Sequence, residues 1–218
     1  EVLCGSEGEG CAVLGLPWIA PELREERGEI QAALAGALPT LIEVGQRRAE
    51  LHSHSTWSDG RATLREMALA ARARGLQILA ITDHSGGLGV TGGLNEEDIA
   101  RQRAEIEALQ QEFGDSLRLL QGAEVEIRAD GSLDYRDDIL AQFDLVIASL
   151  HTSLRQPRAQ VTARLLKAIH NPHVDIIGHP TGRLLPDREG ADLDMDAVLT
   201  AAAASGVALE INANPQRL

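Results

Sequence analysis

Short apolar runs alternate with amphipathic windows along this chain from about residue 49 onward. The apolar runs have the length and composition of buried strands, and they cover residues 77–82, 117–123, 144–150, 174–178 and 207–211. The amphipathic windows follow the helical period, and they cover residues 63–75, 95–114, 135–142, 159–169 and 195–204. This alternation of strand and helix predicts a parallel α/β fold.

Residues 1–48 show no such alternation of strand and helix. Residues 14–21 form a proline-punctuated extended segment, and residues 22–37 resemble a helix interrupted near Gly28 and Gly36. We therefore expect an arm over residues 1–48 that packs against a neighbour, and a main domain over residues 49–218. Because the chain does not begin with methionine and ends at Leu218 without a polar tail, we expect it to be part of a longer protein.

Composition and charge narrow the class of protein. The net charge of −13 disfavours a broad basic surface for nucleic acid, although a small cleft that binds phosphate needs few arginines. No apolar run approaches the roughly 20 residues that a membrane span needs, so we expect no membrane partner. Cys4 and Cys11 do not form a close pair, and we interpret them as free thiols of a cytoplasmic protein.

Each predicted strand is followed by a polar residue that can bind a metal ion or a substrate. These residues are Asp83 and His84 after the first run, and then Glu124, His151, His179 and Asn212. In (β/α) barrels the active site lies at the carboxyl ends of the strands. We therefore expect these side chains to meet in one site.

A further strand is expected near His52 and His54, which are two positions apart. Residues spaced in this way point to the same face of a strand, so both imidazoles would enter one cavity. Asp59 follows five residues after His54. The alternative for this motif alone is a pair of surface histidines before a turn, because Ser58, Asp59 and Gly60 favour turns.

Imidazole and carboxylate groups together suit Mn²⁺, Zn²⁺ or Fe²⁺. Five histidines exceed the needs of one ion, so we expect two or three ions, with Glu124 bridging them. Such a site is suited to hydrolysis of phosphoesters. We expect catalytic roles for Glu124, His151 and Asp83, the last as a ligand, a partner of bound water or an acceptor that orients a histidine. The predicted metal ligands are His52, His54, Asp59, His84, Glu124, His151 and His179.

Other charged residues receive simpler interpretations. We expect His170 and His173 to lie outside the site, and Glu126 to lie beyond the end of its strand. An acidic run at Asp192, Asp194 and Asp196 is interpreted as the first turn of the last helix. Three arginines near strand ends are predicted to contact substrate phosphate, namely Arg155, Arg158 and Arg183.

Five ordered motifs resemble the PHP (polymerase and histidinol phosphatase) superfamily. They are HSHSTWSDG at 52–60, TDH at 82–84, GAEVE at 122–126, SLH at 149–151 and GHPTGR at 178–183. The resemblance covers about residues 49–218 and is strongest to the PHP domain at the C-terminus of bacterial family X DNA polymerases. Residues 16–25 (LPWIAPELRE) resemble the segment that joins the polymerase region to this domain. NANP at 212–215, with Arg217 and Leu218, resembles the domain near its end.

The resemblance implies a distorted (β/α)7 barrel with a trinuclear manganese or zinc site. It also implies hydrolysis of DNA 3′ ends in repair, as a 3′–5′ exonuclease, 3′-phosphatase and abasic-site endonuclease, with DNA and a preceding polymerase domain as partners. Members of this family close the site with a later Asp-x-His pair. That pair would come from beyond Leu218, so we expect full metal binding and full activity only when the pair is present. We expect no polymerase activity from residues 1–218.

Two other functions stay open. The same site could hydrolyse a small phosphomonoester such as histidinol phosphate, although the arm over residues 1–48 disfavours a free-standing phosphatase. The domain could also bind metal without catalysis and support a polymerase, although every visible ligand position carries a residue that can bind metal.

Overall fold

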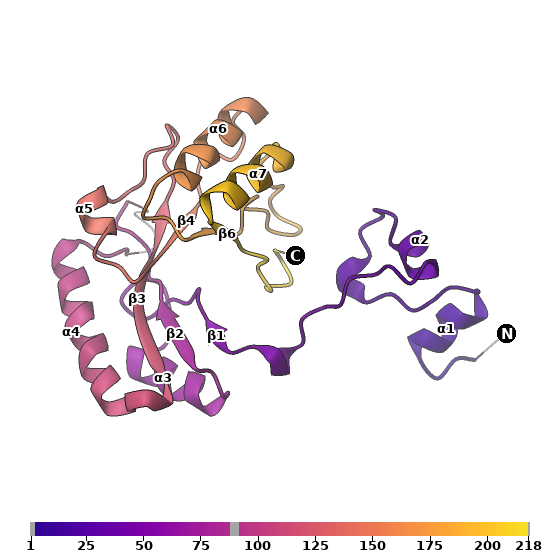
Figure 1. Ribbon diagram of the computed structural model, residues 1–218, viewed down its shortest axis with the longest axis horizontal. Coiled ribbons are helices and arrows are strands. Elements are labelled where there is room, and N and C mark those ends of the chain that lie inside the picture. The colour runs from indigo at the N-terminus through magenta and orange to yellow at the C-terminus, as the bar shows by residue number, and fades with distance from the viewer. Residues whose placement is uncertain (1–2, 88–91, 218) are drawn as a thin grey trace. The chain divides into compact units, whose positions relative to one another are not determined.

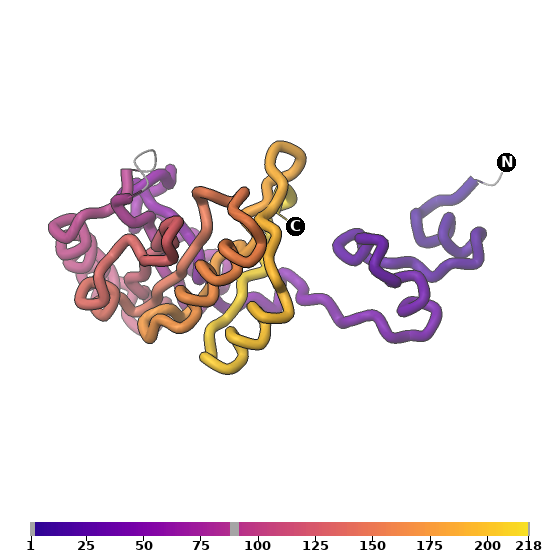
Figure 2. Tube along the Cα trace, turned by 90° about the horizontal axis from the view of Figure 1, so that it is seen from above, coloured from indigo at the N-terminus to yellow at the C-terminus, as the bar shows by residue number. Residues whose placement is uncertain are grey.

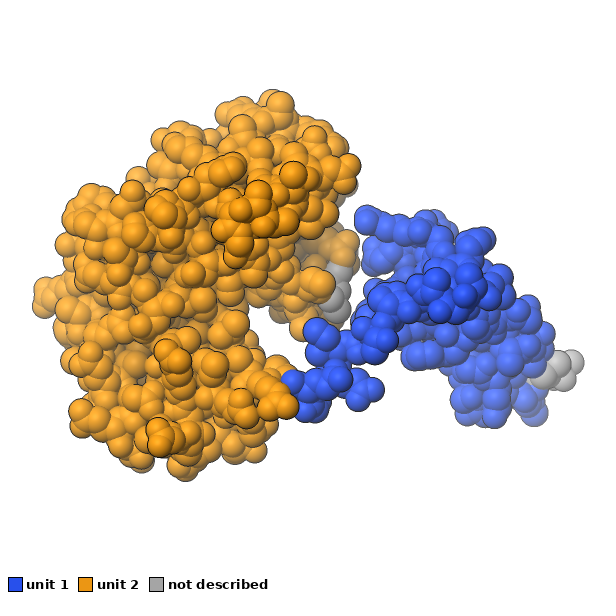
Figure 3. Space-filling view, in the orientation of Figure 1, with its two compact units in different colours: residues 1–46 blue, residues 47–218 orange. Residues whose placement is uncertain are grey.

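A computed structural model describes residues 3–87 and 92–217 of the chain, so Leu218 of the predicted domain lies outside the described residues. The chain divides into two compact units, Glu1–Gln46 and Arg47–Leu218 (Figure 3). The second unit begins two residues before the predicted start of the main domain at residue 49.

The first unit contains short helices joined by irregular segments. Helix α1 starts where Ser6 accepts a hydrogen bond from the backbone N–H of Glu9 at 3.2 Å. The interruptions expected near Gly28 and Gly36 are present, because both glycines have left-handed backbone conformations, with φ of 96° and 67°. The elements of this unit are α1 (Glu7–Val13), η1 (Pro21–Leu23), α2 (Glu29–Leu34) and η2 (Val44–Gln46).

A small ion-pair cluster joins distant parts of the first unit. The guanidinium of Arg24 contacts Oε1 of Glu7 at 2.7 Å, and the indole of Trp18 donates to Oε2 at 3.1 Å. The hydrogen bond from Arg24, followed by that from Trp18, lowers the pKa of Glu7 to about 2. The charged form of this exposed carboxyl group therefore ties α1 to the segment after it.

Six parallel strands form one sheet in the second unit, in the sequence order β1 to β6 (Figure 1). The prediction of a parallel α/β fold is therefore confirmed. The strands curl into part of a barrel of the (β/α) type, with helices outside. They are β1 (Ala49–Glu50), β2 (Ile78–Ile81), β3 (Arg118–Glu126), β4 (Leu145–Ser149), β5 (Ile176–Gly178) and β6 (Ala208–Leu209).

The helices of the second unit cover the sheet in two groups (Figure 1, Figure 2). One apolar cluster joins α3 and α4 to β2 and β3, and another joins α6 and α7 to β3, β4 and β5. Ile177 and Leu165 are fully buried in the second of these clusters. The helices are α3 (Leu64–Ala73), α4 (Glu96–Phe113), η3 (Gly114–Ser116), α5 (Asp137–Leu140), α6 (Arg158–Ile169) and α7 (Met195–Ser205).

Helix ends follow the sequence signals closely. Thr63 and Glu66 form the predicted capping box of α3, and Asn95 caps α4 through the backbone N–H groups of its first turn. Gly206 ends α7 with φ of 73°. No helix within residues 3–87 and 92–217 has the length and apolar character needed to cross a membrane.

Two strand ends differ from the prediction and shape the site. β3 continues to Glu126, so Glu126 lies within the strand rather than beyond it. β1 ends at Glu50, and the following segment stays extended beside β2 through other contacts: Ser53 accepts from the backbone N–H of Thr82 at 2.8 Å, and the hydroxyl of Ser53 donates to the carbonyl of Ala80 at 2.7 Å. These contacts keep His52 and His54 aligned without a regular strand.

Candidate metal centre

A cavity of about 500 Å³ lies at the carboxyl ends of the strands. Residues from β1, β2, β3, β4 and β5, or from the loops that directly follow these strands, contribute to its wall. The structure brings all seven predicted ligands together at this cavity. They line it with Thr152, Arg188, Asn212 and Arg217.

Glu124 lies at the centre of the cluster and is 1% exposed. Its Oε1 lies 2.9 Å from Nε2 of His179, 3.2 Å from Nε2 of His151 and 3.3 Å from Nε2 of His52. Its Oε2 lies 3.1 Å from Nδ1 of His84 and 3.4 Å from Nε2 of His54. One carboxylate therefore faces five imidazoles, which is the arrangement expected of a bridging ligand.

Asp59 belongs to a side of the cluster that is more open to solvent. Its carboxylate is 48% exposed, and it lies 3.7 Å from Nδ1 of His54 and 3.6 Å from Nε2 of His84. His54 and His84 stack with ring centroids 4.4 Å apart. These two imidazoles therefore have one nitrogen toward Asp59 and the other toward Glu124.

Close packing of backbone makes room for the imidazoles. A Cβ at Gly178 would lie 2.5 Å from the hydroxyl of Ser149 and 3.2 Å from Cε1 of His52, so a side chain there would displace the ligand. His179, the next residue, has φ of 27°, which residues other than glycine rarely adopt. Such strain is typical of functional sites, because the surrounding structure must hold it.

Burial and charge act in opposite directions on the pKa values of the cluster. Burial favours the neutral form of both His52 and His151, but hydrogen bonds to carboxylates outweigh it and raise their pKa to about 10 and about 9. Burial also opposes ionisation of Glu124, yet the close imidazoles of His151, His179 and His52 hold its pKa well below the usual range. Burial, more than the nearby charges, lowers the pKa of His54 and His84.

The donor set fits metal ions. Three groups of side chains each place their ligand atoms within 4.8 Å of one another: His52, His54 and Glu124; His54, Asp59 and His84; and His84, Glu124 and His151. Among the described residues, the buried Nδ1 atoms of His54, His84 and His179 and Oε1 of Glu124 have no hydrogen-bond partner. Buried polar atoms normally have partners, so these are candidates for metal coordination.

Two carboxylates behind the cluster are not among the predicted functional residues. Glu210 contacts Nδ1 of His52 at 2.8 Å and accepts from the backbone N–H of His179 at 2.7 Å. Glu126 contacts Nδ1 of His151 at 2.8 Å, and the buried guanidinium of Arg164 lies 3.3 Å from it. Each orients an imidazole so that Nε2 faces Glu124, as carboxylates often do for metal-bound histidines.

Both carboxylates have a signal in the sequence. Glu126 alternates with Glu124, so the two share a face of β3 once the strand is known to reach Glu126. Glu210 lies within the apolar run 207–211, two residues before Asn212. The rule that functional residues follow a strand selects Asn212 and passes over a carboxylate inside the run.

Asp83 does not line the cavity, although it adjoins His84 in the chain. It is 2% exposed, and its oxygens accept hydrogen bonds from Ser55, Ser58 and Gln102. Of the roles expected for Asp83, the geometry favours an acceptor that positions other groups. Its catalytic role stays a prediction, as do those of Glu124 and His151.

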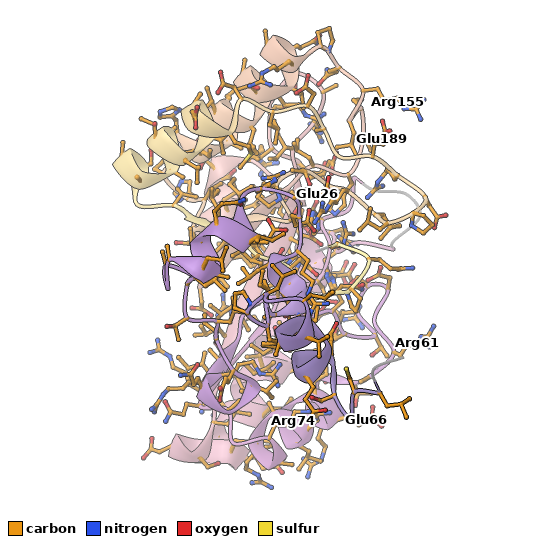
Figure 4. The ribbon with its side chains drawn as sticks, turned by 90° about the vertical axis from the view of Figure 1, so that its right-hand side faces the viewer. Glu26, Arg61, Glu66, Arg74, Arg155 and Glu189 are labelled. Atoms are coloured by element: carbon orange, nitrogen blue, oxygen red, sulfur yellow. The ribbon has the colours of Figure 1, made fainter. Side chains whose placement is uncertain are left out.

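The arginines of the cavity are not the three that the sequence predicts. Arg188 and Arg217 line the cavity, whereas Arg155, Arg158 and Arg183 do not. Arg158 pairs with Asp192 at 3.1 Å. The side chain of Arg155 is exposed and points away from the protein (Figure 4).

Arg183 contacts the backbone beside the cavity, since its Nε donates to the backbone carbonyl of Arg217 at 3.2 Å. Burial lowers the pKa of Arg217, and the nearby charge of Arg188 lowers it further. Neither Arg188 nor Arg217 forms an ion pair with a carboxylate of the described residues. Two like charges that face one cavity favour an anion there.

The remaining charged residues lie where the sequence suggested, except that Asp192 precedes α7 and its cap and pairs with Arg158. His170 caps the end of α6 and contacts the carbonyl of Leu166 at 2.7 Å, and neither it nor His173 lines the cavity. Asp194 caps α7 by accepting from the backbone N–H of Ala197 at 3.3 Å. These residues have structural environments that need no metal.

Comparison with known proteins places the chain among phosphoesterase relatives. The profile of the family described as PHP domain matches residues 50–214. The chain is 49% identical, over 98% of its length, to a protein of Bacillus subtilis described as DNA polymerase/3′-5′ exonuclease PolX. It is 35% identical over 75% of its length to a probable phosphatase of Thermoanaerobacter sp.. It spans 37% and 63% of those two relatives, respectively.

Solved structures support the fold. A histidinol phosphate phosphatase of Lactococcus lactis, in complex with zinc, L-histidinol and phosphate, aligns with a TM-score of 0.58 at 22% identity. The alignment covers 78% of this chain and 76% of that protein. A putative histidinol phosphatase of Listeria monocytogenes aligns with the same TM-score at 12% identity, covering 76% of this chain and 82% of that protein.

Proposed function

The chain belongs to the PHP domain family, and we propose that its second unit is a metal-dependent phosphoesterase. The observation that carries this proposal is the convergence of five imidazoles on one buried carboxylate, in a cavity that two arginines also line. The three ligand groups would hold two or three ions of Mn²⁺ or Zn²⁺, with Fe²⁺ as a further candidate. When bound, such ions supply Lewis-acid activation of water and of the phosphoryl group.

The residues of the chain have distinct tasks in this proposal. Glu124 contacts the histidines through both oxygens and would link the ions. Glu126 and Glu210 hold His151 and His52 with Nε2 toward the cavity. Glu124, His84 and His179 are buried, so solvent screens the electrostatic contacts of these groups less.

Arg188 and Arg217 would receive the substrate phosphate. A guanidinium matches the geometry of phosphate oxygens and can donate two hydrogen bonds to them. Backbone hydrogen bonds hold the loop that carries Arg188, since Leu184 and Arg188 pair with each other. The phosphate contacts expected for Arg155, Arg158 and Arg183 stay predictions. They apply to a nucleic acid that is long enough to extend beyond the cavity.

We further propose that the substrate is the 3′ end of DNA, as in exonuclease, 3′-phosphatase and abasic-site reactions of repair. The 49% identity over 98% of the chain to a protein described as a polymerase and 3′-5′ exonuclease supports this choice. In that case residues 1–48 are an arm that adjoins a polymerase domain in the same protein. The alternative is a small phosphomonoester, which the similarity to probable phosphatases favours.

The deciding experiment combines metal analysis with two substrates. The full-length protein, of which this chain is expected to be a part, would be purified and assayed on a labelled 3′-recessed duplex and on histidinol phosphate, with Mn²⁺ or Zn²⁺ and with a chelator. We expect chelator-sensitive hydrolysis of the duplex, and its loss in His54→Ala with the circular dichroism spectrum unchanged. His170→Ala, which alters an exposed histidine outside the cavity, is the matched control.

Each result separates the candidates. Hydrolysis of histidinol phosphate alone would favour the small-molecule phosphatase. Metal binding without hydrolysis of either substrate would favour a catalytically silent support for a polymerase. Full activity in His54→Ala would contradict the metal centre described here.

A further inference from the structure

Asp83 is a buried carboxylate whose hydrogen-bond donors do not themselves line the cavity. Its Oδ1 accepts from the backbone N–H of Ser55 at 2.7 Å and from the hydroxyl of Ser58 at 2.6 Å. Its Oδ2 accepts from the hydroxyl of Ser55 at 2.6 Å and from the amide of Gln102 at 2.7 Å. All four donors are neutral, and no arginine, lysine or histidine of the described residues forms an ion pair with Asp83. Hydrogen bonds from neutral donors, without any ion pair, therefore satisfy this carboxylate.

The donors of Asp83 lie between two proposed metal ligands. His54 comes immediately before Ser55, and Asp59 comes immediately after Ser58. The loop between them is closed on itself, because the backbone N–H groups of Ser58 and Gly60 donate to the carbonyl of Ser55 at 3.1 Å and 2.9 Å. Asp83 thus accepts hydrogen bonds from residues at both ends of the short segment that joins the two ligands.

A second set of buried contacts holds Asp83 from behind. Gln121 of β3 donates to Oε1 of Gln102 and to the carbonyl of Ile99, each at 2.9 Å. Gln102 and Gln121 are both fully buried. This line of hydrogen bonds runs from the sheet through α4 to the loop, and buried networks of this kind rigidify the groups they join.

Asp59 has few contacts of its own. Its carboxylate is 48% exposed, and apart from the two histidines its polar contact among the described residues is the hydroxyl of Ser58 at 3.5 Å, which lies closer to Asp83 at 2.6 Å. A side chain with so few contacts takes its position from the backbone that carries it. The position of Asp59 relative to His54 and His84 therefore depends on the hydrogen bonds that Asp83 accepts from Ser55 and Ser58.

We propose that Asp83 is a positioning residue that assembles one metal subsite, made of His54, Asp59 and His84. Through Ser55 and Ser58 it holds the loop so that Asp59 faces the two imidazoles. This inference rests on the proposed metal centre. It assigns Asp83 a role without contact with substrate or metal ions.

The test compares Asp83→Asn with the unaltered protein in two measurements. The substituted amide replaces one acceptor oxygen with an NH₂ group, which cannot accept from the two donors that point at it. In the metal-free protein, we expect amide hydrogen exchange over residues 55–60 to rise about tenfold or more, since local opening becomes easier. In titrations with Mn²⁺, we expect one ion to lose affinity about 10- to 100-fold while the others keep theirs.

Two further variants keep the test decisive. Ser58→Ala removes one donor and leaves Asp83 with three, so it preserves the fold, and we expect the same two changes at smaller size. Asp175→Asn is the matched control, because Asp175 also accepts a backbone N–H, from Val146 at 2.9 Å, but at the opposite ends of the strands. It should change neither measurement.

Selectivity distinguishes positioning from general stabilisation. A weakened affinity for every ion, with exchange raised throughout the second unit, would overturn the proposal in favour of a purely structural role. Unchanged exchange over residues 55–60 in both Asp83→Asn and Ser58→Ala would also overturn it. If the unaltered protein bound no metal, the proposed function would fail, and the exchange measurement would still decide whether Asp83 holds the loop.

Discussion

Replacing Arg188 or Arg217 with glutamine should weaken phosphate binding at the candidate metal centre. Both guanidiniums line the cavity, and neither is neutralised by an ion pair with a carboxylate of the described residues. Glutamine keeps much of the side-chain length and its polarity but removes the charge. The substitution therefore tests the charge rather than the packing of each side chain.

The expected size follows from the exposure of the two arginines. A hydrogen bond to a charged group contributes about 1.5–3 kcal/mol, which corresponds to a factor of roughly 10 to 150 in affinity. Both side chains are only partly buried, so water screens the interaction with phosphate, and the lower end of this energy range applies. We expect each single variant to lose about tenfold in affinity for phosphate, and the double variant to lose at most about 100-fold.

The assay is the inhibition constant of inorganic phosphate, measured at fixed metal concentration alongside the KM for the 3′-recessed duplex. Arg158→Gln is the matched control, because Arg158 is also predicted from sequence but pairs with Asp192 outside the cavity. For DNA, each lost phosphate contact should also reduce the salt slope by about one unit. Wild-type inhibition constants in both Arg188→Gln and Arg217→Gln, together with a loss in Arg158→Gln, would refute the assignment.

Other parts of the structure lead to three further predictions. Glu210→Gln should lower metal affinity about 10- to 100-fold, measured by competition with a chelator, because the carboxylate orients His52. Arg164→Met should lower the free energy of unfolding in urea by about 3 kcal/mol, because it breaks a buried ion pair while Glu126 keeps its contacts with His151 and Thr152. The pKa of Glu7 is about 2 against an ordinary 4.5, so its contribution to the first unit is complete above pH 4.5 and is lost as the pH falls through 2. The indole N–H resonance of Trp18 should shift over that range in NMR spectra, and Glu7→Gln should abolish the shift.

The order of the elements could be predicted from sequence because strand and helix signals alternate without ambiguity. Apolar runs of strand length predict β2 to β6, and the caps at Thr63 and Asn95 predict the starts of α3 and α4. A parallel sheet puts all carboxyl ends at one edge. That rule, applied to the sequence alone, is sufficient to bring His84, Glu124 and His151 together.

Residues on loops could not be placed in this way. Arg188 and Arg217 reach the cavity because the segment near Gln216 packs against the loop at Leu185, whose backbone N–H donates to the Gln216 carbonyl at 2.6 Å. This contact joins segments 31 residues apart that follow no periodic pattern, so hydrophobic periodicity carries no information about it. The prediction of Arg155, Arg158 and Arg183 rests on their distance along the chain from a ligand. That distance is a weak guide when loops fold back.

The contacts of the imidazoles divide the five histidines into two classes. Glu210 and Glu126 hold Nδ1 of His52 and His151, whereas the buried Nδ1 atoms of His54, His84 and His179 have no hydrogen-bond partner among the described residues. The first two keep their orientation through protein contacts alone. For the other three, the positions of the carrying loops matter most, because no hydrogen bond to Nδ1 among the described residues fixes the ring. The protein therefore orders the cluster in two ways. Carboxylates bind individual imidazole rings, and buried groups such as Asp83 hold the backbone next to other ligands through hydrogen bonds.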